Sequence, residues 1–367
     1  RGMNRIDPSL AATLRHPAEL VTRGLVPASA LAELEKVAAR YAIAVTPEIA
    51  ALIEPGDPAD PIALQFIPSA QELIAAPGEN PDPIGDDAHS PVSGIVHRYP
   101  DRVLFKLVHV CAVYCRFCFR REMVGPGKPN ALSDDAYRAA LDYIRGHGEI
   151  WEVILTGGDP LMLAPRRLAE IMADLAGIGH VRIVRIHTRV PVADPARVNA
   201  EMVEALKVRG ATTWVAVHAN HAHEFSDAAR AACARFADAG IPLVSQSVLL
   251  RGVNDNAATL EALMRTFVEL RIKPYYLHHG DLAPGTAHLR TTLEHGQELM
   301  RKLRGRVSGL CQPEYVLDIP GGHGKAPVGP SYLSQPDSPQ PDKLAKTRYR
   351  VVDYCGEVHL YPPPQAS

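Results

Sequence analysis

The sequence has no apolar run of the roughly 18 residues that a membrane-spanning helix needs, and its first residues lack the apolar core of a secretory signal. It also has no basic block and no acidic tail, and its formal net charge is only −2. These absences argue against a membrane protein and against a nucleic-acid-binding protein. We therefore expect a soluble, cytoplasmic protein.

Cysteine is scarce and unevenly placed. The chain has six cysteines, of which Cys233, Cys311 and Cys355 are scattered. The other three lie within eight residues, at positions 111, 115 and 118. An extracellular disulfide framework would not crowd its cysteines in this way in so long a chain. Metal ligation in a reducing compartment fits better, and we expect Cys233 and Cys311 to be small buried residues.

Apolar runs of strand length alternate with alanine-rich segments of helical spacing through the middle of the chain. This alternation predicts βα units around a parallel sheet, and so an α/β fold. Six strands are too few for a closed eight-stranded barrel, so a partial TIM-like barrel and a doubly wound sheet are both compatible. The expected strands are Val103–Val110, Trp151–Thr156, Val181–His187, Thr213–His218, Leu243–Leu250 and Pro274–His278. The expected helices are Asp134–Arg145, Pro165–Ala176, Ala196–Val208, Asp227–Ala239 and Ala257–Leu270.

Three regions follow from this pattern. Residues 1–95 form a helical N-terminal region, residues 96–291 form the barrel, and residues 292–367 form a C-terminal α+β extension. The N-terminal region is expected to contain helices at Ala28–Tyr41 and Pro47–Ile53. The C-terminal region is expected to contain a helix, a strand, a proline-rich loop and a hairpin, at Leu293–Leu303, Tyr315–Ile319, Pro327–Pro341 and Arg348–Leu360.

Polar residues stand at or just after the ends of five expected strands. They are Cys111, Asp159, His187, His218 and Asp281. In barrels and in open parallel sheets alike, functional residues lie just beyond the carboxyl ends of the strands. The pattern therefore predicts one reactive site at this edge of the sheet.

The three clustered cysteines have the spacing C-x3-C-x2-C, with Cys111, Cys115 and Cys118 as the candidate metal ligands. Three thiolates on one tight loop suit an iron–sulfur cube, because they bind three irons and leave the fourth iron open. A structural zinc site is the alternative, and it normally closes with a fourth ligand, for which His109 is available. The unusual spacing favours the cluster.

This loop resembles the signature of the radical S-adenosylmethionine (SAM) superfamily, in which an aromatic residue, here Phe117, precedes the third cysteine. The stretch Leu155–Pro160 (LTGGDP) is similar to the glycine-rich turn that binds the amino group of SAM in that superfamily. The resemblance assigns Gly157, Gly158 and Asp159 to SAM binding. Glycines let a ligand approach the backbone closely, and the aspartate supplies a negative charge.

A more specific resemblance, to the lysine 2,3-aminomutases, covers nearly the whole chain. The matching segments are residues 97–103 (HRYPDRV), 115–121 (CRFCFRR), 245–250 (SQSVLL), 252–255 (GVND), 280–282 (GDL), 285–288 (GTAH) and 318–325 (DIPGGHGK). The resemblance implies a partial (β/α)6 TIM-like barrel and an isomerase that moves an amino group between C2 and C3 of lysine. It also implies a [4Fe–4S] cluster, SAM and pyridoxal 5′-phosphate, an electron donor such as flavodoxin or ferredoxin, and a homo-oligomer.

The same resemblance assigns the cofactor-binding residues. Lys325 would hold pyridoxal phosphate as a Schiff base and would be the catalytic lysine, and Arg98 and Arg102 would lie near the phosphate. His218 and Gln246 would line the SAM pocket. Without the flanking match, Lys325 would be read as a solvated lysine in a glycine-rich turn, and the arginines as surface residues. A phosphate-binding P-loop is excluded, because Ala326 follows the lysine where that motif needs serine or threonine.

The substrate assignment also rests on the resemblance. Arg120 would face the α-carboxylate, and Asp281 and Asp318 would face the distal amine. A buried ammonium must be paired, so two carboxylates select strongly for a cationic side chain. Family members that act on glutamate replace these aspartates, so their presence here favours a cationic substrate.

Two departures leave alternatives open. The well-known lysine aminomutases carry a zinc site, but the corresponding barrel position here is Asn256 and the chain ends in PPPQAS without cysteines, so we expect no structural zinc. The shorter C-terminus is similar to a second branch, which β-modifies a lysine for attachment to elongation factor P. Free lysine is our first choice, that branch is second, and arginine is a further cationic possibility. A non-catalytic iron–sulfur or zinc scaffold is the alternative from another class.

Overall fold

The computed structural model describes residues 12–125, 130–334 and 349–363. Its main element is a nine-stranded sheet in which the strands follow one another in sequence order, from β1 to β9. Strands β2 to β8 run parallel, and β1 and β9 add to the two edges in the antiparallel direction. The strands are β1 (Ile95–Tyr99), β2 (Arg102–Val108), β3 (Glu152–Gly157), β4 (Ile183–Thr188), β5 (Thr212–His218), β6 (Leu243–Val248), β7 (Ile272–His278), β8 (Glu314–Asp318) and β9 (Lys325–Pro327).

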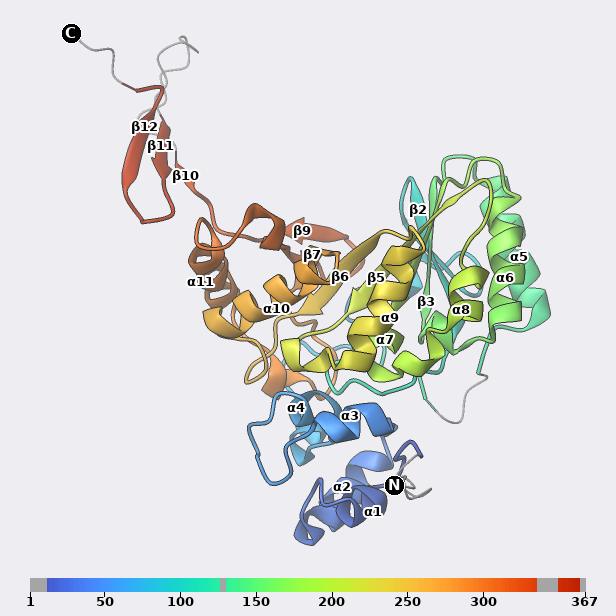
Figure 1. Cartoon of the computed structure of the whole chain (residues 1–367), viewed down its shortest axis with the longest axis horizontal. Coiled ribbons are helices and arrows are strands. Elements are labelled where there is room, and N and C mark those ends of the chain that lie inside the picture. The colour runs from blue at the N-terminus through green and yellow to red at the C-terminus, as the bar shows by residue number, and fades with distance from the viewer. Residues whose placement is uncertain (1–11, 126–129, 335–348, 364–367) are drawn as a thin grey trace, which may run out of the picture.

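The strand order decides between the two architectures that the sequence allows. A doubly wound sheet reverses its strand order at a switch point, whereas here the order runs one way from edge to edge. Figure 1 shows the covering helices ranged along the sheet in chain order, from α5 and α6 to α10 and α11. The fold is thus an α/β partial barrel, as predicted, and it gains a seventh parallel strand because the expected strand 315–319 joins β7.

The helices that cover the sheet follow the predicted ones closely. They are α5 (Asp134–Gly146), α6 (Pro165–Ala176), α7 (Val190–Ala193), α8 (Ala200–Ala205), α9 (Asp227–Asp238), α10 (Ala257–Glu269) and α11 (Leu293–Leu303). The expected helix 196–208 is instead a 3-10 turn followed by α8. The break occurs at Asn199, whose side-chain Oδ1 accepts a hydrogen bond from the Met202 amide at 2.9 Å and so starts a new helix.

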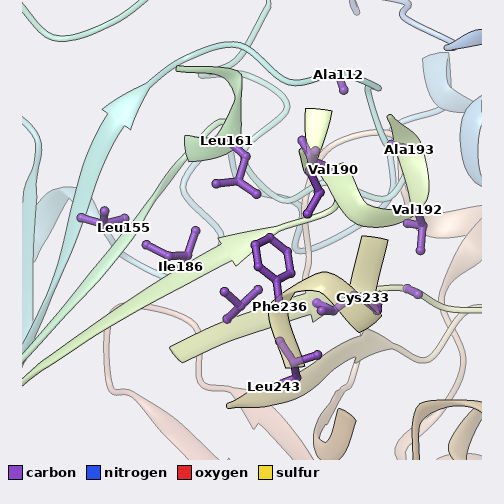
Figure 2. Packing of buried hydrophobic residues seen from close by; sticks show 14 of the residues in the cluster. Ala112, Leu155, Leu161, Ile186, Val190, Val192, Ala193, Cys233, Phe236 and Leu243 are labelled. Atoms are coloured by element: carbon purple, nitrogen blue, oxygen red, sulfur yellow. The ribbon is translucent and has the colours of Figure 1, made fainter. Parts of the chain in front are cut away.

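The core lies between the sheet and these helices. Parallel strands are covered on both faces, which is why β3 carries four consecutive buried residues, Val153 to Thr156. Figure 2 shows Phe236 of α9 close to Ile186 of β4, with Cys233 of the same helix beside it. Cys233 and Cys311 are both buried, as predicted.

Short helices make up the N-terminal segment, below the barrel in Figure 1. They are α1 (Pro17–Thr22), α2 (Leu31–Ala38), α3 (Pro47–Leu52) and α4 (Ala63–Phe66). The segment is joined to the barrel through Glu72, which is buried and accepts hydrogen bonds from Arg116 and Arg121 of the cysteine loop. The Arg116 Nε to Glu72 Oε1 distance is 2.9 Å. The N-terminal segment therefore contacts the cysteine loop directly.

A small antiparallel sheet projects away from the barrel at the other end (Figure 1). It consists of β10 (Leu333–Ser334), β11 (Tyr349–Val352) and β12 (Val358–Tyr361). Strands β11 and β12 form the predicted hairpin, with Gly356 at a φ of 90° in its turn. Part of the expected proline-rich loop lies outside the described residues. Within the described ranges, no helix combines the length and apolarity needed to cross a bilayer.

Candidate active site

One cavity at the carboxyl edge of the sheet brings together all the residues that the resemblance assigned to the site, whereas His109, the possible fourth zinc ligand, lines a separate cavity. The cysteine loop after β2, the glycine turn after β3, the ends of β5, β6 and β7, and the β8–β9 hairpin all contribute to its wall. The candidate residues in the wall are Arg98, Arg102, Cys111, Cys115, Cys118, Arg120, Gly157, Gly158, Asp159, His218, Gln246, Asp281, Asp318 and Lys325. Segments that are more than 200 residues apart in the sequence thus meet at one site.

The cysteine loop is held by its backbone and by one arginine. The amides of Tyr114 and Arg116 donate to the carbonyls of Ala44 and Gln65 in the N-terminal segment. The buried Arg116 guanidinium also donates to the Ala42 carbonyl at 2.7 Å. The loop therefore depends on the N-terminal segment for its shape.

The three thiols face a shielded environment. Burial removes the thiols from water, and this is the main reason why their pKa values are raised. The pKa of Cys115 rises to about 12, and those of Cys111 and Cys118 are raised as well. Such thiols stay protonated at neutral pH unless a cation binds, so metal binding must release their protons. No group of three or more histidine, cysteine, aspartate or glutamate side chains in the described ranges is arranged to hold a single metal ion.

The glycine turn packs against the start of the cysteine loop. A Cβ at Gly158 would lie 2.2 Å from the Val110 carbonyl oxygen, and one at Gly157 would lie 2.4 Å from that of Val108. Gly157 also has a φ of 113°, which other residues rarely adopt. The amide of Gly158 donates to the Val108 carbonyl at 2.6 Å. These contacts fix the distance between the glycine turn and Cys111.

Asp159 lies in the cavity wall, but its carboxylate is turned toward protein donors. It accepts hydrogen bonds from the Thr188 hydroxyl at 2.8 Å and from the Arg189 amide at 2.7 Å, and it caps the following turn through the Leu161 amide. Burial raises its pKa, and these donors oppose that rise. The geometry indicates that Asp159 anchors the ends of β3 and β4 to each other.

Two histidines stand side by side at the ends of β4 and β5. The rings of His187 and His218 are 5.3 Å apart in an edge-to-face arrangement, and both line the cavity. The Nε2 atom of each is buried and has no hydrogen-bond partner within the described part of the chain. Burial lowers the pKa of His187, and it lowers that of His218 to about 3. Both rings are therefore neutral, and each offers an unused polar atom; Gln246 lies beside His218 on the paired strand β6.

Lys325 opens β9 and reaches the cavity beside Asp318. Its Nζ atom is 2.6 Å from Asp318 Oδ1, and its backbone amide donates to the Tyr99 hydroxyl at 2.6 Å. The other carboxylate oxygen of Asp318, Oδ2, is 3.1 Å from Nδ1 of His278. Burial alone would raise the pKa of Asp318, but the bond to His278 and the Lys325 charge outweigh it and hold that pKa well below its usual range.

Asp281 is the least satisfied acid in the cavity. Its Oδ1 atom is buried and has no hydrogen-bond partner within the described residues. Burial, reinforced by the nearby Asp318 charge, raises the pKa of Asp281 to about 7. This carboxyl group therefore changes its charge near neutral pH, and a cation beside it would favour the ionised form.

The three candidate arginines form two arrangements. Arg98 and Arg120 share the buried Asp86, at 3.0 Å each, and Nε of Arg98 has no hydrogen-bond partner in the described ranges. Arg102 pairs with Asp101, and its guanidinium lies 3.9 Å from the centre of the Tyr99 ring. Tyr99, in turn, contacts Lys325. The cavity thus has arginines close to the lysine.

Sequence reasoning missed three residues that complete these contacts: Asp86, Tyr99 and His278. His278 ends a predicted strand, so the strand-end criterion that selected His187 and His218 would also have selected it. Tyr99 lies within the matching segment 97–103. Asp86 falls in a stretch that reads as a loop from its composition, and no local signal marks it.

Comparisons with known proteins give a consistent result. A family model for the radical SAM superfamily matches residues 105–264, and a lysine-2,3-aminomutase model matches residues 300–365. The L-lysine 2,3-aminomutase of Clostridium subterminale is 43% identical over 79% of this chain and 70% of that protein. That of Fusobacterium nucleatum is 38% identical over 88% and 74%, respectively.

Two further matches complete the picture. A glutamate 2,3-aminomutase of Clostridioides difficile is 37% identical over 82% of this chain and 70% of that protein. Among solved structures, a radical SAM methyltransferase from Sphaerobacter thermophilus aligns with a TM-score of 0.43 and 20% identity, over 61% of this chain and 68% of that one.

Proposed function

Because the chain belongs to the lysine 2,3-aminomutase family of radical SAM enzymes, which are isomerases, we propose that it interconverts L-lysine and β-lysine. The reaction moves the amino group between C2 and C3. One observation carries the proposal: Lys325, the three thiols and the acidic pair Asp281 and Asp318 line the same cavity.

The family implies a [4Fe–4S] cluster and SAM, and the cavity wall fits both. Three thiols on one loop are the donor set that such a cluster requires. The buried, unpartnered Nε2 of His218 suits a polar ligand beside the cluster, and Gly157 and Gly158 let the glycine turn pack directly against the start of the cysteine loop. When bound, cluster and SAM supply a radical that takes a hydrogen atom from the substrate. The protein residues align the reactants and keep water away from them.

Pyridoxal phosphate is the third cofactor of the proposal. Lys325 would hold it covalently, since a primary amine in the cavity wall is open to an aldehyde. Arg98, whose Nε atom has no partner within the described residues, and Arg102 would hold its phosphate. When bound, this cofactor supplies the conjugated system that carries the migrating amino group. Tyr99 orients the lysine by accepting a hydrogen bond from its backbone amide.

Substrate choice follows from the charges in the cavity. We propose that Arg120, held by Asp86, binds the α-carboxylate, and that Asp281 and Asp318 bind the distal ammonium. A glutamate side chain would bring a third carboxylate beside the two aspartates, and like charges in a buried site repel strongly. The acidic pair therefore favours lysine over glutamate, although a glutamate 2,3-aminomutase is among the relatives.

Product analysis tests the proposal directly. The enzyme is reconstituted anaerobically with iron, sulfide, SAM, pyridoxal phosphate and a chemical reductant, and is then given L-lysine, L-arginine or L-glutamate. We expect β-lysine from lysine and no β-amino acid from glutamate. A β-amino acid formed only from arginine would favour arginine, the further cationic possibility, as the substrate. The absence of any product in the presence of a full cluster would contradict the aminomutase assignment.

Two partners belong to the same proposal. Reduction of the cluster needs an electron donor, for which a flavodoxin or a ferredoxin is suitable. We also propose a homo-oligomer, because the small sheet β10–β12 exposes Leu333, Val358 and Tyr361, and a sheet of this size gains stability by covering its apolar side chains.

A further inference from the structure

His278 is a buried histidine with one bonded and one unused ring nitrogen. It is the last residue of β7, and its side chain lines the cavity. Nδ1 lies 3.1 Å from Oδ2 of Asp318, whose other oxygen contacts Lys325. Nε2 is buried and has no hydrogen-bond partner within the described residues. The ring therefore bridges Asp318 and the cavity.

The Asp318 contact fixes which nitrogen of His278 carries the proton. An ionised carboxylate only accepts hydrogen bonds, so Nδ1 must be the donor. Burial lowers the pKa of His278 more than the contact with Asp318 raises it, so the ring is neutral. In a neutral ring with the proton on Nδ1, Nε2 is an acceptor with an unused lone pair. A buried acceptor without a partner is uncommon in proteins, and a ligand donor in the cavity would account for it.

Two carboxyl groups in the wall of the same cavity also offer hydrogen-bond acceptors. Oδ1 of Asp281 is also a buried atom of the cavity wall with no partner in the described ranges. Asp318 offers Oδ1, the oxygen that Lys325 now contacts, while its Oδ2 keeps the contact with His278. Once the Lys325 amine is engaged elsewhere, the wall presents three acceptors from Asp281, Asp318 and His278. A primary ammonium has three N–H groups, whereas a guanidinium has five in one plane.

Resting on the function proposed above, we propose that His278 is a specificity-determining residue whose Nε2 accepts a hydrogen bond from the distal ammonium of the substrate. The substrate class is then a diamino monocarboxylic acid that ends in a primary ammonium. A third, neutral acceptor completes the coordination of that group without adding another negative charge to the two aspartates. It also disfavours a planar guanidinium, whose five donors cannot all meet three acceptors.

The test compares His278→Asn with His279→Asn. An asparagine amide can keep the donor to Asp318 but removes the acceptor at the position of Nε2. His279 is the adjacent residue, and its Nδ1 is likewise bonded, to the Tyr315 hydroxyl at 2.8 Å, but the residue does not line the cavity. Binding of L-lysine and of L-norleucine, which lacks the distal ammonium, is measured by calorimetry on enzyme loaded with cluster and pyridoxal phosphate, without SAM or reductant.

We expect the preference for lysine over norleucine to fall about 10- to 100-fold in His278→Asn, the usual effect of losing a hydrogen bond to a charged group. Norleucine affinity should stay unchanged, and His279→Asn should bind both ligands like the wild type. In His278→Gln the longer side chain brings an amide oxygen near the Nε2 position, so part of the preference should return. This second variant also covers the case in which His278→Asn does not fold.

Two results would overturn the inference. One is an unchanged lysine preference in His278→Asn, or in His278→Gln if only that variant folds. The other is an equal loss of lysine and norleucine binding, which would make His278 merely structural. Failure of the proposed function looks different, because then the wild-type enzyme itself would not prefer lysine over norleucine.

Discussion

Asp318 and Lys325 lie directly opposite each other on the antiparallel strands β8 and β9, with Lys325 Nζ 2.6 Å from Asp318 Oδ1. The lysine amine thus neutralises a buried carboxylate that would otherwise be costly to keep ionised. When the amine is used to hold a cofactor, the carboxylate becomes available to another ammonium. The same aspartate can therefore position the lysine before the cofactor binds and the substrate afterwards.

Asp281→Asn should change how stability depends on pH. Burial raises the pKa of Asp281 to about 7, far above the value near 4 of an unfolded aspartate. A pKa that is raised in the folded state stabilises the protein fully when the pH is below the pKa of the unfolded state. This contribution is lost as the pH rises through the pKa of the folded state. As the pH rises from about 4 to about 7, the variant should therefore gain stability relative to the wild type, by up to roughly 4 kcal/mol in total, the free energy that separates a pKa near 4 from one of about 7.

Unfolding measured at several pH values on the ligand-free protein checks this prediction. Added L-lysine should reduce the difference, because a bound ammonium favours the ionised carboxylate of the wild type. A difference between variant and wild type that does not vary with pH would show that Asp281 titrates normally.

Gly158→Ala should disturb the site through the backbone. The added Cβ would lie 2.2 Å from the Val110 carbonyl oxygen, so the turn and the cysteine loop must move apart. We expect a loss of about 1–3 kcal/mol in stability and weaker binding of SAM. Gly146→Ala is the matched control, because a Cβ at this helical residue meets nothing within 4 Å. Calorimetric titration with SAM should show normal binding in the control. If Gly158→Ala bound SAM as tightly as the control, the account would be contradicted.

Glu72→Gln should loosen the N-terminal segment. Glu72 is the buried acceptor for both Arg116 and Arg121, and its loss leaves two buried guanidinium groups without their carboxylate. Breaking a buried pair in this way costs about 3–5 kcal/mol. In Glu261→Gln, the exposed pair with Arg265 is broken instead, and the cost should be under about 0.5 kcal/mol. Denaturant unfolding separates the two outcomes, and equal costs would contradict the anchoring role of Glu72.

Metal analysis should find iron without stoichiometric zinc. Asn256, the barrel position at which the resemblance would place a zinc-binding cysteine, caps helix α10 by accepting a hydrogen bond from the Thr259 amide at 2.9 Å. An amide in a helix cap is a poor zinc ligand compared with a thiolate. Elemental analysis of the purified, reconstituted protein tests this expectation. One zinc per chain that survives mild chelation would refute it.

Local sequence patterns predicted the elements whose formation is local. Helix α6 has the predicted bounds because Pro165 starts it and its apolar residues recur with helical spacing. The predicted start of strand β5 differs from the observed one by a single residue. Its central residues are buried because helices cover the sheet, and such a strand has a continuous apolar run in its sequence.

Edge strands and side-chain contacts were not predictable in the same way. Strand β9 has three residues and includes Pro327, so only its pairing with β8 makes it a strand. The contact between His278 and Asp318 joins residues forty positions apart and depends on the register of β7 and β8. Asp86 contacts Arg120 because the N-terminal segment runs past the cysteine loop, and no local sequence pattern predicts that course. Motif resemblance selected residues that line one cavity, whereas their mutual contacts required the fold.

The role of Lys325 is the central claim, and chemical trapping tests it most directly. Holoenzyme treated with borohydride, digested and examined by mass spectrometry should carry a pyridoxyl phosphate group on Lys325. Lys325→Ala should carry none while retaining its iron. A label on another lysine, such as Lys106 in the wall of a separate cavity, or an unlabelled wild-type enzyme that still makes β-lysine, would contradict the account.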